Sequence, residues 1–133
     1  MATTSSFDVS TDERDDTVDV TDHVAASIPD DVETGICTVY VRHTTAGISV
    51  NENESRLRDD TEDFFEELVP DEGHRHDQLD GNADSHLRAT LVGASESIPV
   101  EDGDLSLGRW QSILLLEFDG PRSREVTVTV VGE

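Results

Sequence analysis

Lysine is absent from this 133-residue chain, so all nine of its basic residues are arginine. Without a lysine amine, no Schiff base can form with a carbonyl group. The 31 aspartate and glutamate residues outnumber the arginines and give a formal net charge of -22 at pH 7. Nucleic acids and anionic membranes carry charge of the same sign, so we expect neither as a partner.

Cysteine and long apolar runs are also scarce. The single cysteine, Cys37, lies in an apolar run. It excludes a disulfide framework and a paired-cysteine zinc site, so we expect a small buried core residue. The N-terminus lacks a basic segment followed by an apolar one, and no apolar run reaches the roughly 18 residues of a spanning helix. We therefore expect a cytoplasmic protein with no signal peptide.

Aromatic residues make up only 5% of the chain, and strongly acidic sequences with few aromatics can be disordered. Residues 36–50 and 113–131, however, are dense in valine, isoleucine, leucine and threonine. We therefore predict one folded domain over residues 1–133. We expect this domain to have a halophilic acidic surface, as is typical of proteins adapted to concentrated salt. Salt at 1 M shortens the reach of repulsion between acidic groups to about 3 Å.

Hydrophobic periodicity predicts an α+β fold with a largely antiparallel, sandwich-like sheet core and two main helices. A short helix is expected around residues 22–29. Residues 1–15 are interpreted as either a frayed end or a polar first strand. Alternating or β-branched runs predict the remaining strands. Each of the following segments contains one predicted strand: residues 17–24, 34–45, 46–55, 95–100, 110–118 and 124–132.

The two main helices are predicted over residues 55–68 and 82–93. The first carries an apolar stripe and ends before Pro70. The second can be capped by Asn82 or Asp84. Both helices are expected to turn their apolar residues toward the core, and these residues are Leu57, Phe64, Phe65, Leu68, Leu87 and Leu91.

Histidines are the main candidates for chemistry. Three neutral imidazoles form a common catalytic metal set that leaves one position open for water or substrate. His43 ends a predicted strand beside two threonines, where a histidine is more often structural than functional unless it has partners. His74 and His76 form an H-x-H pair in a polar loop, and His86 lies near the start of the second helix. Only folding can bring these histidines together.

Two further segments offer polar groups. Asn51, Glu52 and Asn53 supply oxygen ligands suited to Mg²⁺ or to a polar substrate, although a helix-capping loop explains them as well. Trp110, the only tryptophan, lies between Arg109 and Gln111 and is either a packing residue or part of a ring- or phosphate-binding pocket. The chain contains no P-loop, no dinucleotide-binding glycine motif and no nucleophile elbow.

The segments "HTTAGISVNENES", "HRHDQLDGNADSHLRATLVGASESIPVEDGDLSLGRWQSILLLEFDGPR" and "VTVTVVGE" together resemble the YjbQ family of secondary thiamine-phosphate synthase-like proteins. The most specific part of the resemblance is "SIPVEDGDLSLGRWQSI". Arg109 departs from the family's usual threonine. The resemblance implies a homotrimer with a polar pocket near the subunit boundary. It implies that His43, His76, His86 and Glu52 are catalytic, that the three histidines bind a divalent metal, either zinc or magnesium, and that substrate contacts come from Thr44, Thr45, Asn51, Asn53, Asn82, Asp84, Arg88, Trp110 and Gln111.

The resemblance further implies a metal-dependent small-molecule enzyme. Its best candidate activity, either the main one or a secondary one, joins hydroxymethylpyrimidine diphosphate to a thiazole phosphate and releases pyrophosphate. Arg42, Arg88 and Arg109 are candidates to screen the anionic substrate. The alternative is a non-catalytic trimer that binds a metal or a metabolite, because a net charge of -22 disfavours a diphosphate substrate. A structural subunit of a larger assembly is the third class.

Overall fold

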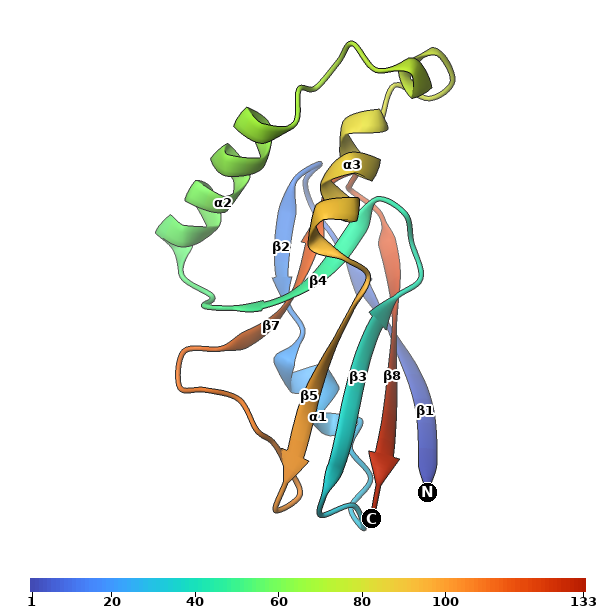
Figure 1. The fold of residues 1–133 in the computed structure, drawn as a ribbon, viewed down its shortest axis with the longest axis vertical. Helices are drawn as coiled ribbons and strands as arrows, with labels where there is room; N and C mark the ends of the chain where they lie inside the picture. Colours follow the sequence, from blue (N-terminus) through green and yellow to red (C-terminus); the bar gives the residue numbers. More distant parts are fainter.

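A computed structural model describes residues 1–133 and shows an α+β fold with two antiparallel sheets (Figure 1). The larger sheet has the strand order β1-β8-β3-β5-β6, and the smaller has the order β2-β7-β4. The strands are β1 (Ala2–Ser10), β2 (Asp16–Asp19), β3 (Gly35–Val41), β4 (Ala46–Asn51), β5 (Ser95–Glu101), β6 (Asp104–Leu105), β7 (Ser112–Glu117) and β8 (Ser123–Gly132).

The helices are few and short. They are α1 (Thr21–Ala26), α2 (Ser55–Leu68), the 3₁₀ turn η1 (Arg75–Gln78) and α3 (Ala83–Val92). The predicted fold class and antiparallel sheets are confirmed. No helix is both long enough and apolar enough to cross a membrane.

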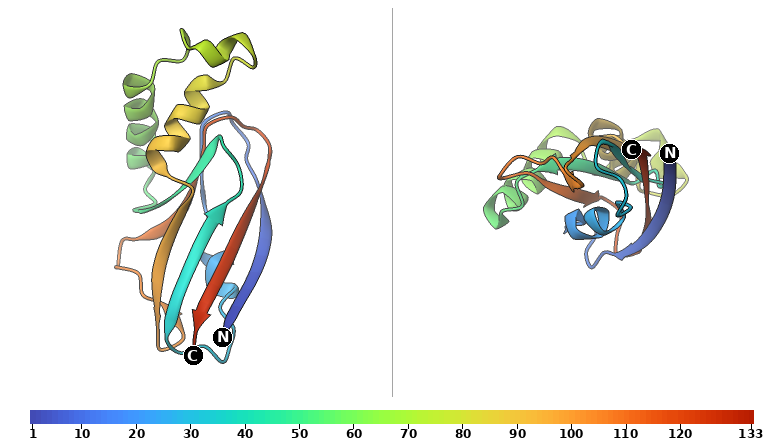
Figure 2. Two further views of the ribbon diagram at one scale, coloured as in Figure 1. Left: turned by 45° about the vertical axis from the view of Figure 1, so that its right-hand side comes forward. Right: turned by 90° about the horizontal axis from the view of Figure 1, so that it is seen from below.

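The hydrophobic core lies between the two sheets, which Figure 2 shows from two further directions. Alternate residues of β3 point inward, so Cys37 and Val39 are fully buried, as are Ile48 of β4 and Leu115 of β7. Period-two alternation in the sequence produces this inward face. The predicted burial of Cys37 is confirmed, and burial raises the pKa of its thiol to about 11.

The N-terminal segment forms strand β1 and is not frayed. It pairs with β8 from Ala2↔Val131 to Ser10↔Ser123, although most of its residues are polar and exposed. Backbone pairing along the whole strand therefore stabilises it, with the buried Val9 and the half-buried Phe7 as its apolar contacts.

The prediction that α2 packs its apolar stripe on the core holds only in part, because Phe65 packs against a small buried cluster while other residues of the stripe stay exposed. No residue of α2 is buried, and Phe64 and Leu68 are 57% and 53% exposed. Only Phe65 makes an aromatic contact with the sheets, an edge-to-face contact of 5.2 Å with Phe118. The periodicity correctly predicts an amphipathic helix, but only a small part of the apolar face of α2 packs against the rest of the chain.

The predicted face of α3 is wrong. Leu87 and Leu91 are exposed, while Asp84, Ser85, Arg88 and Ala89 are buried. The helix lies so close to β4 that a Cβ atom on Gly47 would come within 2.6 Å of Val92. Close packing favours small inward side chains, and the buried charges pair with one another, so the large apolar residues face outward.

Candidate functional site

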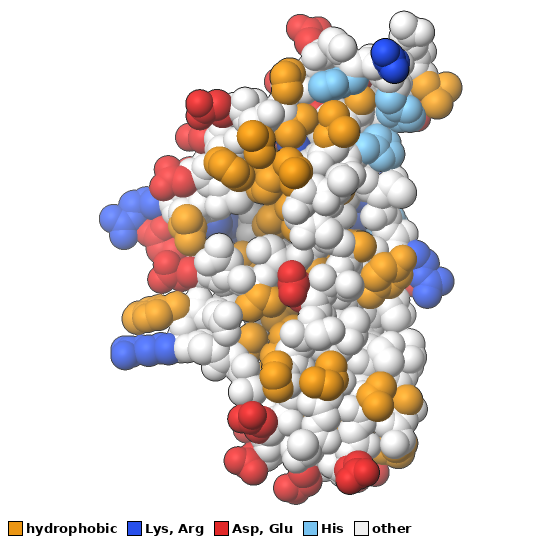
Figure 3. Space-filling view, viewed as in Figure 1, with side chains coloured by type: hydrophobic (Ala, Val, Ile, Leu, Met, Phe, Trp, Pro, Cys, Tyr) orange, Lys and Arg blue, Asp and Glu red, His pale blue; other side chains and the backbone are white.

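Two of the predicted histidines meet in one concave site. The rings of His76, on η1, and His86, on α3, are 4.9 Å apart between centroids and nearly perpendicular. They line an open cavity of about 540 Å³, which we call the histidine cavity. Histidine side chains gather at this end of the molecule in Figure 3. The cavity is lined by Gly73, His74, Arg75, His76, Ala83, His86 and Leu87.

Asp77 ties the turn η1 to helix α3. Its carboxylate accepts hydrogen bonds from the backbone N–H of His74 at 3.1 Å and of Ala83 at 3.3 Å. These bonds, led by that from His74, lower the pKa of Asp77. The two elements that carry His76 and His86 are therefore joined by a charged side chain that stays ionised at neutral pH.

The side chains around the histidine pair differ in their hydrogen bonds and ion pairs. The ring of His74 is hydrogen bonded through Nε2 to the carbonyl of Pro70 at 2.7 Å. Nε2 of His76 lies 3.6 Å from a carboxylate oxygen of Asp80. Arg75 makes no ion pair and no hydrogen bond within the chain, so its guanidinium is free to meet an anion at the rim.

The donor set of the histidine cavity fits zinc better than magnesium. Neutral imidazoles suit Zn²⁺ and similar ions, whereas Mg²⁺ requires an octahedron of oxygen ligands. His76 and His86 supply two nitrogens, with Asp80 as the nearest carboxylate. A carboxylate beside a ligating histidine orients the ring and increases its basicity.

His43 does not line the histidine cavity. Its Nε2 atom accepts a hydrogen bond of 3.0 Å from the backbone N–H of Glu125, which ties the end of β3 to β8. Burial, together with the positive charge of Arg124, lowers the pKa of His43. In this chain the ring is therefore neutral, and the lone pair on Nε2 is used by the backbone.

Asn51, Glu52 and Asn53 lie at the far end of α2 from the histidines. Asn51 and Glu52 line a small cavity of about 30 Å³ beside β4, and the side chain of Asn53 donates to Asp19 at 3.1 Å. The 14 residues of α2 span about 21 Å, because an α-helix rises about 1.5 Å per residue. One chain therefore does not bring this motif to His76.

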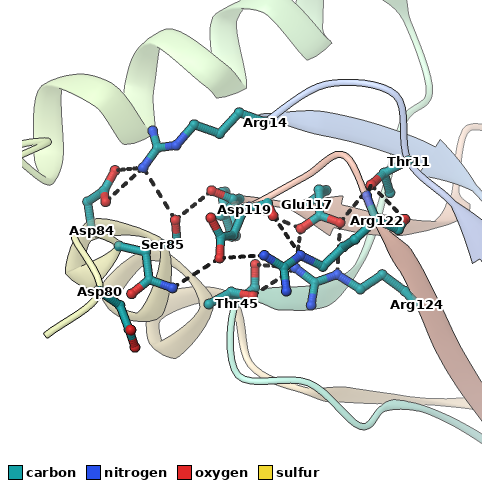
Figure 4. Close-up of polar contacts among 12 residues, drawn as sticks. Thr11, Arg14, Thr45, Asp80, Asp84, Ser85, Glu117, Asp119, Arg122 and Arg124 are labelled. Atoms are coloured by element: carbon teal, nitrogen blue, oxygen red, sulfur yellow. Dashed lines mark hydrogen bonds and ion pairs between the residues drawn. The ribbon is translucent and has the colours of Figure 1, made fainter.

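Asp84 and Arg88 are structural in this chain. Asp84 is fully buried and accepts hydrogen bonds from Arg14 at 2.8 and 2.7 Å (Figure 4). It also accepts a hydrogen bond from Arg88 at 3.1 Å. Arg88 is only 1% exposed and also donates to the Val69 carbonyl and to Asp71. This network fixes the first turn of α3, and so it holds the backbone that carries His86.

Asn82 and Thr45 belong to a second buried network. The Asn82 side chain donates to Asp119 at 3.0 Å, and Arg124 donates to the hydroxyl of Thr45 at 2.7 Å. Arg124 is also paired with Glu117, and both are about 1% exposed (Figure 4). The sequence analysis missed this pair, although a glutamate after three leucines in β7 was its available signal.

Trp110 and Gln111 lie on the loop between β6 and β7, distant from the histidine cavity in Figure 1. Trp110 is 65% exposed, and the guanidinium of Arg109 lies 4.8 Å from its ring centroid. The side chain of Gln111 accepts a 2.7 Å bond from the backbone of Gly108 and closes the loop on itself. Neither residue lines the histidine cavity.

Three carboxylates that the sequence analysis did not single out cluster between α2 and the β1–β2 connection. Oxygens of Asp15, Glu62 and Glu66 lie within 4.8 Å of one another, beside a cavity of about 220 Å³. Burial, followed by the nearby acids, raises the pKa of Glu62, and burial raises that of Asp15 despite Arg88. In the sequence these residues belong to the segment "DERDD" and to a pair of glutamates four residues apart on a helix. Such patterns are common in an acidic chain, so they did not indicate a cluster.

Solved structures support the same fold for related proteins. A YbjQ-like protein of unknown function from Sulfolobus solfataricus is 37% identical, with a TM-score of 0.94 over 100% of this chain and 99% of that one. A hypothetical protein from Aeropyrum pernix is 44% identical, with a TM-score of 0.94 over 98% of this chain and 99% of that one.

Sequence comparisons agree with the structural ones. A UPF0047 protein from Archaeoglobus fulgidus is 49% identical over 89% of this chain and 93% of its own length. The protein YugU from Bacillus subtilis is 37% identical over 93% of this chain and 96% of its own length. The family model described as "UPF0047 protein YjbQ-like" matches residues 5–133. The chain therefore belongs to the YjbQ/UPF0047 family, as its histidine and G-R-W-Q segments indicate.

Proposed function

We propose that this chain binds a divalent metal ion, zinc in preference to magnesium, through His76 and His86, and acts there on a small phosphorylated molecule. The observation that carries the proposal is the pair of imidazole rings, 4.9 Å apart, at the wall of an open cavity. Such an ion supplies positive charge against the oxygens of a phosphate group. The Asp80 carboxylate lies 3.6 Å from Nε2 of His76, and Arg75 adds a guanidinium to the same rim.

The best candidate reaction is the thiamine-phosphate synthase one, in which a carbon–nitrogen bond forms to the thiazole phosphate and a carbon–oxygen bond to pyrophosphate breaks. The support for this substrate is the resemblance to the YjbQ family. The physical requirement is cationic compensation, because a chain of net charge -22 repels a diphosphate elsewhere on its surface. Of the chain's arginines, Arg75 at the cavity meets this requirement without breaking an ion pair.

The variant His86→Ala tests the proposal. The purified variant is dialysed against Zn²⁺, and bound metal is measured together with pyrophosphate release from the two thiamine precursors. We expect bound zinc to fall at least about tenfold, since one of two ligands is lost, and release to fall with it. His23→Ala is the matched control, because His23 stacks on Phe7 outside the cavity. Wild-type metal binding and turnover in His86→Ala would refute the proposal.

A non-catalytic binding protein is the second candidate. The observation that favours it is the separation of the predicted site within one chain, where His43 and Glu52 do not line the histidine cavity. Two histidines alone offer a binding site but little acid–base machinery. Stoichiometric binding of a thiamine precursor without turnover would favour this reading over the enzyme.

A homotrimer located in the cytoplasm remains part of the proposal. A trimer would allow residues separated within one chain, such as Trp110 and the histidine pair, to approach one another across a subunit boundary. Sedimentation of the purified protein measures the number of chains.

A further inference from the structure

The turn η1, which carries His76, is not held in place by apolar packing. None of its residues is buried, and Leu79, directly after it, is 76% exposed. Figure 1 shows the turn at one end of the molecule, beyond the first turn of α3 and away from both sheets. Burial of apolar side chains, which fixes the strands, therefore contributes little to the position of His76.

Glycines lie on both sides of this turn. Gly73 and Gly81 have φ angles of 93° and 70°, and a Cβ atom added at either would meet no other atom within 4 Å. Glycine populates many backbone conformations, and neither position is packed against the rest of the chain. The backbone at these two points therefore does not hold the turn in one orientation against α3.

The side chain of Asp77 holds the turn instead. Its Oδ2 atom accepts a hydrogen bond from the backbone N–H of His74, where the turn begins, and its Oδ1 atom accepts one from Ala83, the first residue of α3. The second bond is the only hydrogen bond between η1 and α3. Ala83 lies about one helical turn before His86. One carboxylate therefore joins the starts of the two elements that present histidines to the cavity.

We propose that Asp77 is a positioning residue, which sets the separation of the His76 and His86 rings and so makes one metal site of two histidines. The inference rests on the proposed metal site, because it assigns a role toward that ion. Asp77 is not itself a ligand, since backbone N–H groups use both of its oxygens. A functional site requires its side chains to be held within about 0.5 Å of the productive geometry, which the turn alone does not provide.

Stepwise removal of the two bonds tests the inference. Asp77→Asn keeps one acceptor oxygen and turns an amide NH₂ toward the other backbone N–H, whereas Asp77→Ala removes both bonds. We expect the affinity for Zn²⁺, measured by calorimetry, to fall about tenfold in Asp77→Asn and further in Asp77→Ala, because residues that support metal ligands typically contribute about 10- to 100-fold. Glu72→Gln, which removes an exposed acid from the same loop, is the matched control and should keep the wild-type affinity.

The separation of the rings is measured without metal. The chain has only five histidines, so the nuclear Overhauser effect between the ring protons of His76 and His86, whose centroids are 4.9 Å apart, can be assigned by NMR. We expect this signal to weaken in Asp77→Asn and to vanish in Asp77→Ala, while the amide signals of the strands stay unchanged. A purely electrostatic effect of the lost charge would lower the zinc affinity and leave the ring contact intact.

Three results would overturn the inference. In the first, the folded variants keep the ring contact, whatever their zinc affinity. In the second, they lose the contact but bind zinc as the wild type does. In the third, both variants lose the strand signals, because Asp77 would then support the whole fold. Failure of the metal proposal looks different: the wild type shows the ring contact and binds no zinc, and the ring contact alone then decides the positioning role.

Discussion

The ring nitrogens of His76 and His86 make no hydrogen bond within the chain, unlike those of His74 and His43. The ring of His74 is hydrogen bonded to a carbonyl, and that of His43 to a backbone N–H. The ring of His86 instead contacts the ring of His76. Sequence motifs predicted which histidines to examine but not which nitrogens the fold would use. Those partners come from residues as distant in sequence as Glu125, and no local pattern contains them.

The acidic cluster at Glu62 makes a prediction at the same scale. The pKa of Glu62 is raised by burial, then by Asp15 and Glu66, so the folded state holds its proton more tightly than the unfolded state does. Ionised Glu62 therefore costs stability at pH 7, and the cost disappears as pH falls through the raised pKa toward the ordinary value of 4.5. Glu62→Gln should stabilise the fold at pH 7 by about 0.5 kcal/mol, a small effect because the group is exposed.

Urea unfolding of Glu62→Gln and wild type at pH 7 and pH 4, in about 0.1 M and about 3 M KCl, measures the difference. The gain should vanish at pH 4 and shrink in high salt, and wild type itself should be more stable in high salt. Glu67→Gln, on the same helix outside the cluster, is the control. A gain that persists at pH 4 would show that ionisation of Glu62 is not its cause.

At the scale of elements, periodicity predicted the strands and helices better than it predicted what they contact. The stripe of α2 is real, yet Phe64 and Leu68 are exposed. In α3 the large residues point outward, because the close approach to Gly47 leaves room only for small or paired side chains. A hydrophobic pattern indicates that a face will be covered, but it does not indicate whether the covering surface belongs to the same chain.

The ion pair that joins β7 to β8 should be a large contributor to stability. Arg124 donates to Glu117 at 2.8 Å through Nε, and both side chains are buried. Arg124→Met leaves the carboxylate of Glu117 buried without its cation, so we expect a loss of about 3–5 kcal/mol. Arg122→Met, which removes a half-exposed pair with Asp119, should cost about 1 kcal/mol or less. Chemical unfolding compares the two, and equal losses would contradict this account.

At the scale of the whole molecule, the surface consists of regions that differ in charge. Most exposed positions are acidic or polar, and Arg75 is an unpaired cation beside the histidine pair. On the outer face of the larger sheet, the outward positions of β1, β8, β3 and β5 form three rows without a charged residue. Composition predicted the acidic surface, but it could not locate the uncharged rows. Their positions follow from strand register, which long-range pairing sets.

Anomalous diffraction at the zinc edge, from crystals grown with Zn²⁺, tests the central claim most directly. The account predicts a peak within about 2.1 Å of one ring nitrogen each of His76 and His86, the usual zinc–imidazole distance. Crystals of His86→Ala grown in the same way should lose that peak. A histidine cavity without a peak in wild-type crystals, with zinc instead at Asp15, Glu62 and Glu66, would contradict it.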